Sequence, residues 1–374
     1  MDSNIKQMKH FIVGPVEMYP CSKAIYQKGY SYFRTEEFGN MVKKNLTRLS
    51  NLIGNKNENS LIYLTASGTA VMEATIENCV DENDKCLVIN GGTFGKRFCE
   101  LLEHHGKNYT SINLEFGEQL TFGHLADYNN KNYSMLFVNL HETSNGQLYD
   151  INLLSDFCKR NNMMLIVDAI STFLADEFDM AKFGIDVTII SSQKGLCISP
   201  GLSFISLSQR VIDKIKKAPK SNTRYFDFKD CLINIERGQT PYTPAVMIMY
   251  ELDAILDYIE ISGGKEKWLE KIKTKCDYFR KNIKDLGLKF PTSYNLSNML
   301  TPVICDDVKA SQVVKLLRDK YGLCVNPCGG ALADKMFRVS HIGNTTIEDI
   351  DILLDKMSVI INKLKNEELV YDRK

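Results

Sequence analysis

Short apolar segments alternate with helical stretches between residues 61 and 207, and this alternation constrains the fold more than any other feature. The expected strands cover residues 61–64, 85–89, 135–140, 163–167, 186–190 and 202–207. Strands that are apolar along their length and separated by helices are typical of a mostly parallel sheet, because helices then cover both of its faces. The sequence therefore predicts an α/β fold.

The pattern changes after about residue 245, where helices lengthen and strands become sparse. The expected elements are helices over 245–259, 265–286, 310–321 and 346–363, and strands over 299–304 and 337–339. These elements predict a smaller α+β unit. We expect an N-terminal segment over residues 1–20, a large domain over 21–260, a small domain over 261–374, and a frayed, charged tail from Asn366.

Composition limits the classes of partner. The chain has 374 residues with 46 basic and 46 acidic side chains, so its formal net charge is zero. A neutral chain offers no electrostatic attraction to nucleic acid or to an anionic membrane. No apolar run reaches the roughly 18 residues that a membrane-spanning helix needs. Residues 1–7 also lack the apolar core of a signal peptide. We expect neither nucleic acid nor a membrane as partner.

Cysteine usage indicates the compartment. The 11 cysteines are scattered and contain no CxxC pair, and the six histidines do not group with them at the spacing of zinc ligands. The adjacent pair His104 and His105 falls on an expected helix, where neighbouring side chains point apart. We therefore expect reduced thiols in a cytoplasmic protein and no metal site.

Polar residues follow the expected strands, at the edge where open parallel sheets bind ligands. Ser67, Gly68 and Thr69 stand between a strand and a helix. Glycine allows close approach, the hydroxyls can donate, and a helix N-terminus favours an anion, so this segment suits a phosphate. It could equally be a simple helix cap.

Two charged residues stand at the ends of further strands. Asp168 follows the apolar residues 163–167, and Lys194 follows the next strand. Each could be a structural charge, since Asp168 could cap or pair and Lys194 could be paired. Together with the phosphate segment, however, they form the set that holds pyridoxal 5'-phosphate. The lysine forms the imine, the acid keeps the pyridine nitrogen protonated, and the helix start takes the phosphate.

At this point the chain resembles the class V, fold-type I pyridoxal-phosphate aminotransferases, such as the alanine–glyoxylate, serine–pyruvate and 2-aminoethylphosphonate transaminases. The matching motifs stand in the same order and cover residues 14–16, 66–74, 91–97, 141–146, 167–171, 191–195, 240–244 and 337–343. The resemblance implies a mostly parallel seven-stranded sheet with helices on both faces and a smaller C-terminal α+β domain. It also implies a homodimer with active sites at the interface.

The resemblance further implies cofactor-binding roles. Lys194 matches the Schiff-base lysine, and Asp168 matches the partner of the pyridinium nitrogen. The other implied cofactor ligands are Phe94 against the ring, Ser67, Gly68, Thr69 and Gln193 at the phosphate, Thr143 and Ser171 beside the ring, and Thr240 and Thr243 from the neighbouring subunit. Read without the resemblance, Phe94 could be an ordinary core residue.

Substrate binding is implied for Arg338, Gly14 and Arg34. Arg338 matches the arginine that clamps the substrate carboxylate, although a surface salt bridge is its simpler interpretation. Two positions depart from the family pattern. Phe33 stands where many relatives have a histidine before the arginine, and Ser340 precedes His341 where a glycine is more usual.

The resulting hypothesis is a transaminase that moves an amino group from a small amino acid or amine to a 2-oxo acid such as pyruvate or glyoxylate. The alternative is a lyase of the cysteine desulfurase type. Cys328 precedes Arg338 on the neighbouring loop, as that alternative needs, but Gln193 stands before Lys194 where those enzymes have a histidine. A non-catalytic protein of the same fold would lack the lysine or carry a DNA-binding domain.

Overall fold

The computed structural model describes residues 8–57, 60–219 and 221–371, so the predictions for residues 1–7 and 372–374 lie outside it. Its larger sheet has seven strands. Their order is β2 (Leu61–Leu64), β10 (Ser203–Leu207), β9 (Val187–Ser191), β8 (Met164–Asp168), β5 (Met135–Asn139), β3 (Cys86–Asn90) and β4 (Tyr109–Asn113). Strands β9 through β4 are mutually parallel, whereas β10 is antiparallel to both neighbours. The predicted fold class is confirmed.

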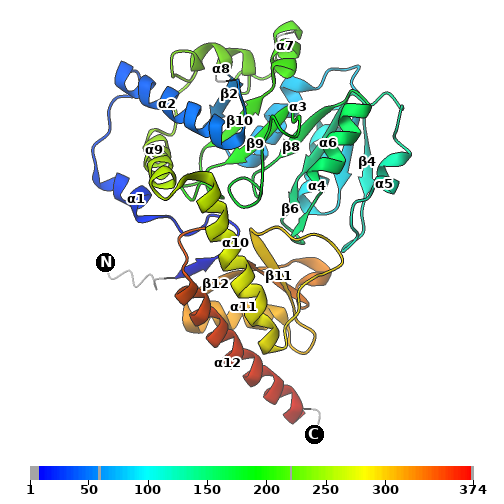
Figure 1. The fold of residues 1–374 in the computed structure, drawn as a ribbon, viewed down its shortest axis with the longest axis vertical. Coiled ribbons are helices and arrows are strands. Elements are labelled where there is room, and N and C mark those ends of the chain that lie inside the picture. The colour runs from blue at the N-terminus through cyan, green and yellow to red at the C-terminus, as the bar shows by residue number, and fades with distance from the viewer. Residues whose placement is uncertain (1–7, 58–59, 220, 372–374) are drawn as a thin grey trace.

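Helices cover both faces of this sheet (Figure 1). They include α2 (Glu36–Ile53), α3 (Gly68–Cys79), α4 (Thr93–His104), α6 (Ile151–Arg160), α7 (Gln209–Lys217), α8 (Phe228–Ile235) and α9 (Val246–Ile261). Every residue of β5 and β9 is buried, as expected for central strands under two helical layers. Within the described ranges, no helix has the length and apolar content to cross a lipid bilayer.

The sequence analysis did not predict strand β4 or several helices around the larger sheet, among them α2, α7 and α8. Strand β4 carries polar side chains at Thr110, Ser111 and Asn113 and pairs with one neighbour only, so it shows no continuous apolar run. Helix α2 was not predicted, although Thr35 caps it by accepting from Phe38 N at 3.3 Å.

A second sheet has four strands in the order β1 (Lys9–Phe11), β12 (Leu323–Pro327), β13 (Met336–Ser340) and β11 (Leu300–Ile304). Strand β1 is parallel to β12, and the other pairs are antiparallel. The helices beside it are α10 (Gly264–Asn282), α11 (Ala310–Leu316) and α12 (Ile347–Tyr371). The N-terminal segment thus supplies an edge strand to the C-terminal sheet.

Helix α10 reaches both hydrophobic cores, as its course in Figure 1 shows. Trp268 and Ile272 belong to the larger core, whereas Phe279 belongs to the smaller one. The domain limits at residues 20 and 260 stay predictions.

The predicted end of the last helix near residue 363 is wrong. Helix α12 continues to Tyr371, so the tail expected to fray from Asn366 is helical as far as that residue. Residues 366–371 contain glutamates and a leucine, which favour helix, and no glycine or proline to end it. A charged composition therefore did not mark the end of the helix.

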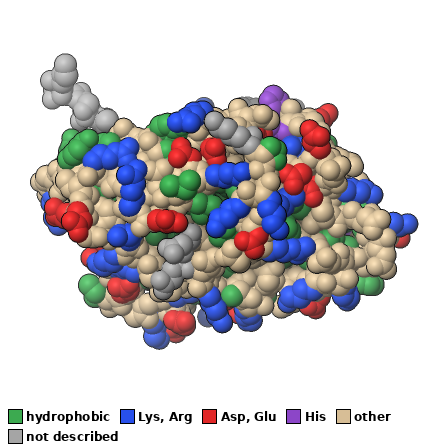
Figure 2. Space-filling model, turned by 90° about the horizontal axis from the view of Figure 1, so that it is seen from above, with side chains coloured by type: hydrophobic (Ala, Val, Ile, Leu, Met, Phe, Trp, Pro, Cys, Tyr) green, Lys and Arg blue, Asp and Glu red, His purple; other side chains and the backbone are tan. Residues whose placement is uncertain are grey.

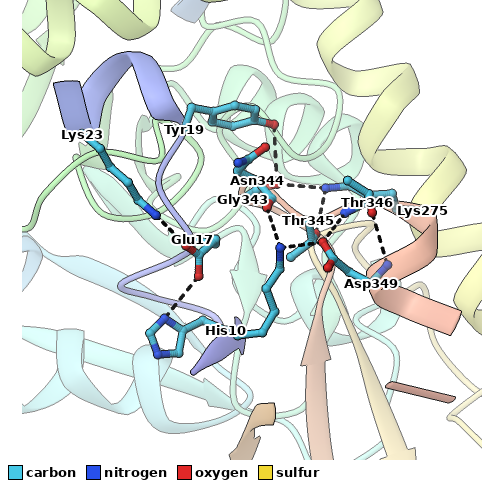
Figure 3. Close-up of polar contacts among 11 residues, drawn as sticks. His10, Glu17, Tyr19, Lys23, Lys275, Gly343, Asn344, Thr345, Thr346 and Asp349 are labelled. Atoms are coloured by element: carbon cyan, nitrogen blue, oxygen red, sulfur yellow. Dashed lines mark hydrogen bonds and ion pairs between the residues drawn. The ribbon is translucent and has the colours of Figure 1, made fainter. Parts of the chain in front are cut away.

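Polar contacts hold the segment between β1 and α1 (Pro20–Lys23) against the start of α12 (Figure 3). Lys9 Nζ lies 2.6 Å from an Asp349 carboxylate oxygen, and Asn344 N donates to Glu17 O at 2.8 Å. The Glu17 side chain pairs with Lys23 at 2.8 Å. Since Gly14 lies within this segment, the contacts help to fix its backbone.

Basic and acidic side chains both occur across the face drawn in Figure 2.

Candidate active site

The carboxyl ends of β8 and β9 and the turn between β2 and α3 surround a cavity of about 190 Å³. The predicted residues that line it are Ser67, Gly68, Thr69, Phe94, Thr143, Asp168, Ser171, Gln193 and Lys194. The structure therefore brings together residues from five separate sequence motifs at the edge where parallel sheets bind ligands.

Lys194 is enclosed just beyond the end of β9. A Cβ atom at Gly14 would lie 2.8 Å from Lys194 Cδ and 3.1 Å from Nζ, so only glycine leaves room for this side chain. Gly14 also has a φ of +141°, which L side chains rarely adopt. Burial lowers the pKa of Lys194 to about 8, although the nearby Asp168 charge acts in the opposite direction. A substantial fraction of the amine is thus neutral in mildly alkaline solution.

Asp168 is the last residue of β8 and is buried. Its Oδ1 accepts a hydrogen bond from Ile170 N at 2.8 Å. Burial raises the pKa of this carboxyl to about 6, against the hydrogen bond and the Lys194 charge, which lower it. Asp168 therefore remains mostly ionised at neutral pH and offers a carboxylate to a cationic partner.

The N-terminus of α3 forms another wall of the cavity. Ser67 Oγ accepts from Ala70 N at 3.3 Å, so Ser67 is a helix cap, as one of the two interpretations predicted. The first N–H groups of a helix have no partner within the helix. Arg97 adds a positive charge here, because its guanidinium donates to Thr69 Oγ1 at 3.3 Å. This combination suits an anion.

Four residues that line the cavity were missed as site residues, and two of them, Arg97 and His141, have titratable side chains; the other two are Met72 and Ile170. The Arg97 guanidinium lies 4.8 Å from the centre of the Phe94 ring. Arg97 follows Phe94 by three positions on α4, and this spacing places both on one helical face, which could have identified Arg97. His141 belongs to the short strand β6 (His141–Glu142). In an extended chain, side chains two positions apart point to the same side, so the predicted Thr143 could have identified His141.

His141 is almost completely buried and neutral. Its Nδ1 lies 3.3 Å from Ser171 O, which favours a proton on Nδ1. Burial lowers the pKa of the imidazole to about 3. The buried Nε2 has no hydrogen-bond partner among the described residues, so an acceptor remains unsatisfied beside the cavity.

Thr143 connects this cavity to Arg338. Its hydroxyl donates to Ser171 Oγ at 2.9 Å, and its carbonyl accepts from Arg338 at 2.8 Å. The Arg338 guanidinium also donates to Pro327 O at 2.8 Å. Its buried Nε is unpaired, and Arg338 forms no ion pair in the part of the chain that the structure describes. The simple salt-bridge interpretation of Arg338 thus finds no carboxylate partner there.

Arg338 lines a second cavity of about 630 Å³, to which Phe94 also contributes. The adjoining cavity therefore offers a cationic donor set for a carboxylate. Cys328 lines it too, but burial raises the pKa of the Cys328 thiol, which disfavours the nucleophilic thiolate.

Arg34, Thr240 and Thr243 line neither of these two cavities in their own chain. Arg34 donates to Gln239 Oε1 at 3.2 Å and to Thr240 O at 3.0 Å. The Thr240 hydroxyl donates to Tyr242 O at 2.6 Å, and Thr243 is exposed. Thr240 and Thr243 line a separate small pocket.

No group of three or more His, Cys, Asp or Glu side chains in the described ranges could hold a metal ion.

The mostly parallel sheet with an aspartate and a lysine beyond adjacent strands places the chain in the fold-type I class. More specifically, the chain belongs to the aminotransferase class-V family, whose model matches residues 23–353. This is a pyridoxal-phosphate-dependent family of enzymes.

Relatives match nearly the whole chain. The soluble hydrogenase 42 kDa subunit of Anabaena cylindrica is 28% identical over 373 residues, covering 98% of this chain and 96% of that protein. The serine–glyoxylate aminotransferase of Arabidopsis thaliana is 25% identical, with 89% and 85% coverage.

Solved structures show the same fold. The alanine–glyoxylate aminotransferase from Nostoc sp. has a TM-score of 0.89 at 24% identity and covers 96% of this chain and 97% of its own. The cysteine desulfurase from Thermococcus onnurineus has a TM-score of 0.75 at 13% identity, with 96% and 95% coverage. The cysteine desulfurase alternative is therefore supported only by a distant similarity.

We expect Gly14→Ala to lower kcat/KM by about 100-fold, because the added methyl group displaces the Lys194 side chain. Steady-state kinetics and thermal unfolding should be measured together. Gly29→Ala is the matched control, since a Cβ at Gly29 meets no atom within 4 Å. Unchanged kinetics in Gly14→Ala would show that Lys194 needs no such space.

We expect Asp168→Asn to remove most activity, by at least about 100-fold, without destabilising the cofactor-free protein at pH 8. The raised pKa means that ionising Asp168 costs the folded state about 3 kcal/mol. That penalty grows in the wild type as pH rises from about 4 to above 6.

The melting temperature of Asp168→Asn relative to wild type should therefore increase over this pH range. Asp156 is exposed on α6 and provides the control Asp156→Asn, which should change neither the activity nor the melting temperature. A lower melting temperature in Asp168→Asn at pH 8 contradicts the expected penalty.

Proposed function

We propose that this aminotransferase transfers the amino group of a small amino acid or amine to a 2-oxo acid such as pyruvate or glyoxylate, with pyridoxal phosphate held on Lys194 as a Schiff base. The observation that carries the proposal is the meeting of Lys194, Asp168 and the N-terminus of α3 around one cavity. The glyoxylate aminotransferases among the relatives support the choice of acceptor.

The donor set of the cavity fits the cofactor by its chemistry. An amine suits the aldehyde, a buried carboxylate suits a protonated pyridine nitrogen, and a helix N-terminus with a nearby guanidinium suits a phosphate. The unsatisfied His141 Nε2 is a further sign that the cavity is built to enclose a polar group. When bound, pyridoxal phosphate supplies an electron sink for negative charge at the substrate α-carbon.

Lys194 acts as the proton carrier in this proposal. With the cofactor held in the cavity, the Lys194 Nζ would serve as the general base that takes a proton and the general acid that returns it. The lowered pKa of about 8 suits both the uptake and the release of a proton, because the protonated and neutral fractions of the amine are comparable near that pH.

The remaining residues assigned to the cofactor would hold and orient it. Asp168 binds the pyridine nitrogen and keeps its proton, and Phe94 packs against the ring. The phosphate is assigned to Ser67, Gly68, Thr69 and Gln193, and the edge of the ring to Thr143 and Ser171.

Arg338 is assigned to the substrate carboxylate, which amino acids and 2-oxo acids share. Carbonyl oxygens already orient its guanidinium, and its unpaired Nε offers a further donor. Gly14 is assigned to substrate binding as well, and its missing side chain leaves room for Lys194. Arg34 is likewise assigned to substrate binding.

The working unit in this proposal is a homodimer with shared sites. Thr240 and Thr243 reach the phosphate of the partner, which accords with their position outside the Lys194 cavity of their own chain. Tyr30 and Tyr32, close in sequence to Arg34, are 67% and 66% exposed, and exposed aromatic side chains suit a protein interface.

The proposed compartment is the cytoplasm. All eleven cysteines lie in the described residues and carry free thiols, although most are buried. A reducing compartment maintains that state.

We expect Lys194→Ala to abolish transamination, because no other lysine of the described residues lines the cavity. Borohydride reduction of the loaded wild type, followed by peptide mapping, should place the cofactor on Lys194. Exposed Lys216 on α7 gives the control Lys216→Ala, which should retain the label and the activity. A label on Lys23, Lys85 or Lys96 would refute the assignment.

We expect Lys194→Ala and Thr243→Ala subunits to complement one another after mixing. In a heterodimer both lesions can fall on one of two symmetric sites, so the other site recovers up to about half of the activity of a normal dimer. Sedimentation and activity assays test this. A fully active monomer, or subunits that exchange without recovery, would disprove the shared site.

A further inference from the structure

Glu142 is a fully buried carboxylate beside the proposed active site, and the function described above does not use it. It is the last residue of β6, and its side chain meets the start of α4. Its oxygens accept from Phe94 N and Gly95 N, both at 3.1 Å, and from Asn139 Nδ2 at 3.0 Å. Ser144 donates twice, from N at 3.2 Å and from Oγ at 2.5 Å.

These contacts differ from those of an ordinary buried charge. Glu142 forms no ion pair with any side chain in the described ranges. Its partners are instead uncharged donors, and two of them are N–H groups in the first turn of α4. Such groups lack partners within the helix and carry partial positive charge, so they can stabilise a carboxylate that burial would otherwise penalise.

The same carboxylate leaves no space around it. A Cβ atom at Gly92 would lie 2.5 Å from Ser144 Oγ and 2.6 Å from Glu142 Cδ. The turn that precedes α4 therefore packs directly on the β6 turn, with glycine at the point of contact. This close approach fixes the two segments relative to each other.

Glu142 thereby connects two residues with different proposed roles. On one side it holds the backbone of Phe94, which lines both cavities. On the other side it precedes Thr143, whose carbonyl accepts from Arg338 at 2.8 Å. A substitution of Glu142 is consequently expected to displace both Phe94, which is proposed to contact the cofactor ring, and Arg338, which is proposed to contact the substrate carboxylate.

We infer that Glu142 is a positioning residue that sets the separation between Phe94 at the cofactor ring and Arg338 at the substrate carboxylate. This inference rests on the proposed function. Since amino acids and 2-oxo acids both carry the carboxylate, a displaced Arg338 weakens the binding of both substrates.

Glu142→Gln tests the inference with little change in volume. The amide replaces one acceptor with a donor, which then faces N–H groups that already donate. We expect the dissociation constant for pyridoxal phosphate and the KM for both acid substrates to rise about 10-fold, by more than kcat falls. The visible circular dichroism of the bound cofactor should also weaken, because the Phe94 ring is displaced.

Glu251→Gln is the matched control. Glu251 is equally buried, lies on α9 and accepts from Ser199 N at 2.7 Å. It should lose stability comparably while its KM and visible circular dichroism remain at wild-type values. If Glu142→Gln does not fold, Ser144→Ala removes only the donor at 2.5 Å and should shift the same quantities less and in the same direction.

The possible failures are distinguishable. A wild-type protein that neither binds pyridoxal phosphate nor turns over would contradict the proposed function. A functional wild type beside a Glu142→Gln protein with unchanged KM, cofactor affinity and dichroism overturns the positioning role alone. Equal shifts in Glu142→Gln and Glu251→Gln overturn it as well, because they would reflect general destabilisation.

Discussion

The enclosure of Lys194 and Asp168 beyond adjacent strands is the constraint on which the rest of the site depends. Burial lowers the pKa of the lysine to about 8 and raises that of the aspartate to about 6, although each charge favours the other. The loss of hydration thus outweighs their attraction. An arrangement that penalises both charges is characteristic of a functional site rather than of a structural ion pair.

The surrounding fold supplies what these two residues need. Parallel strands β8 and β9 deliver them to the same edge, and α3 begins at that edge with unpaired N–H groups. The second sheet delivers Arg338, while β1 anchors the segment that carries Gly14. Residues from the beginning and the end of the sequence therefore meet near the lysine, and Glu142 holds the backbone of Phe94, which lines both cavities.

The sequence predicted the central strands and the Lys194 cavity because both leave local signals. Buried parallel strands appear as apolar runs; Asp168 directly follows one of them, and Lys194 comes four positions after the end of the next. Strand β4 gave no such signal, since its edge position tolerates polar residues such as Thr110 and Ser111. Arg97, His141 and Glu142 were missed because their importance depends on contacts between separate segments. Arg34, Thr240 and Thr243 lie outside the cavity of their own chain, so one subunit alone does not test their predicted roles.

Transfer of nitrogen between two acids is the most direct test of the account. The loaded protein is incubated with ¹⁵N-labelled L-alanine and glyoxylate, and the products are followed by mass spectrometry. We expect ¹⁵N-glycine and pyruvate in equal amounts, with no labelled ammonia. Labelled ammonia, or no labelled glycine with alanine or any other small amino acid as donor, would contradict transamination at the Lys194 site.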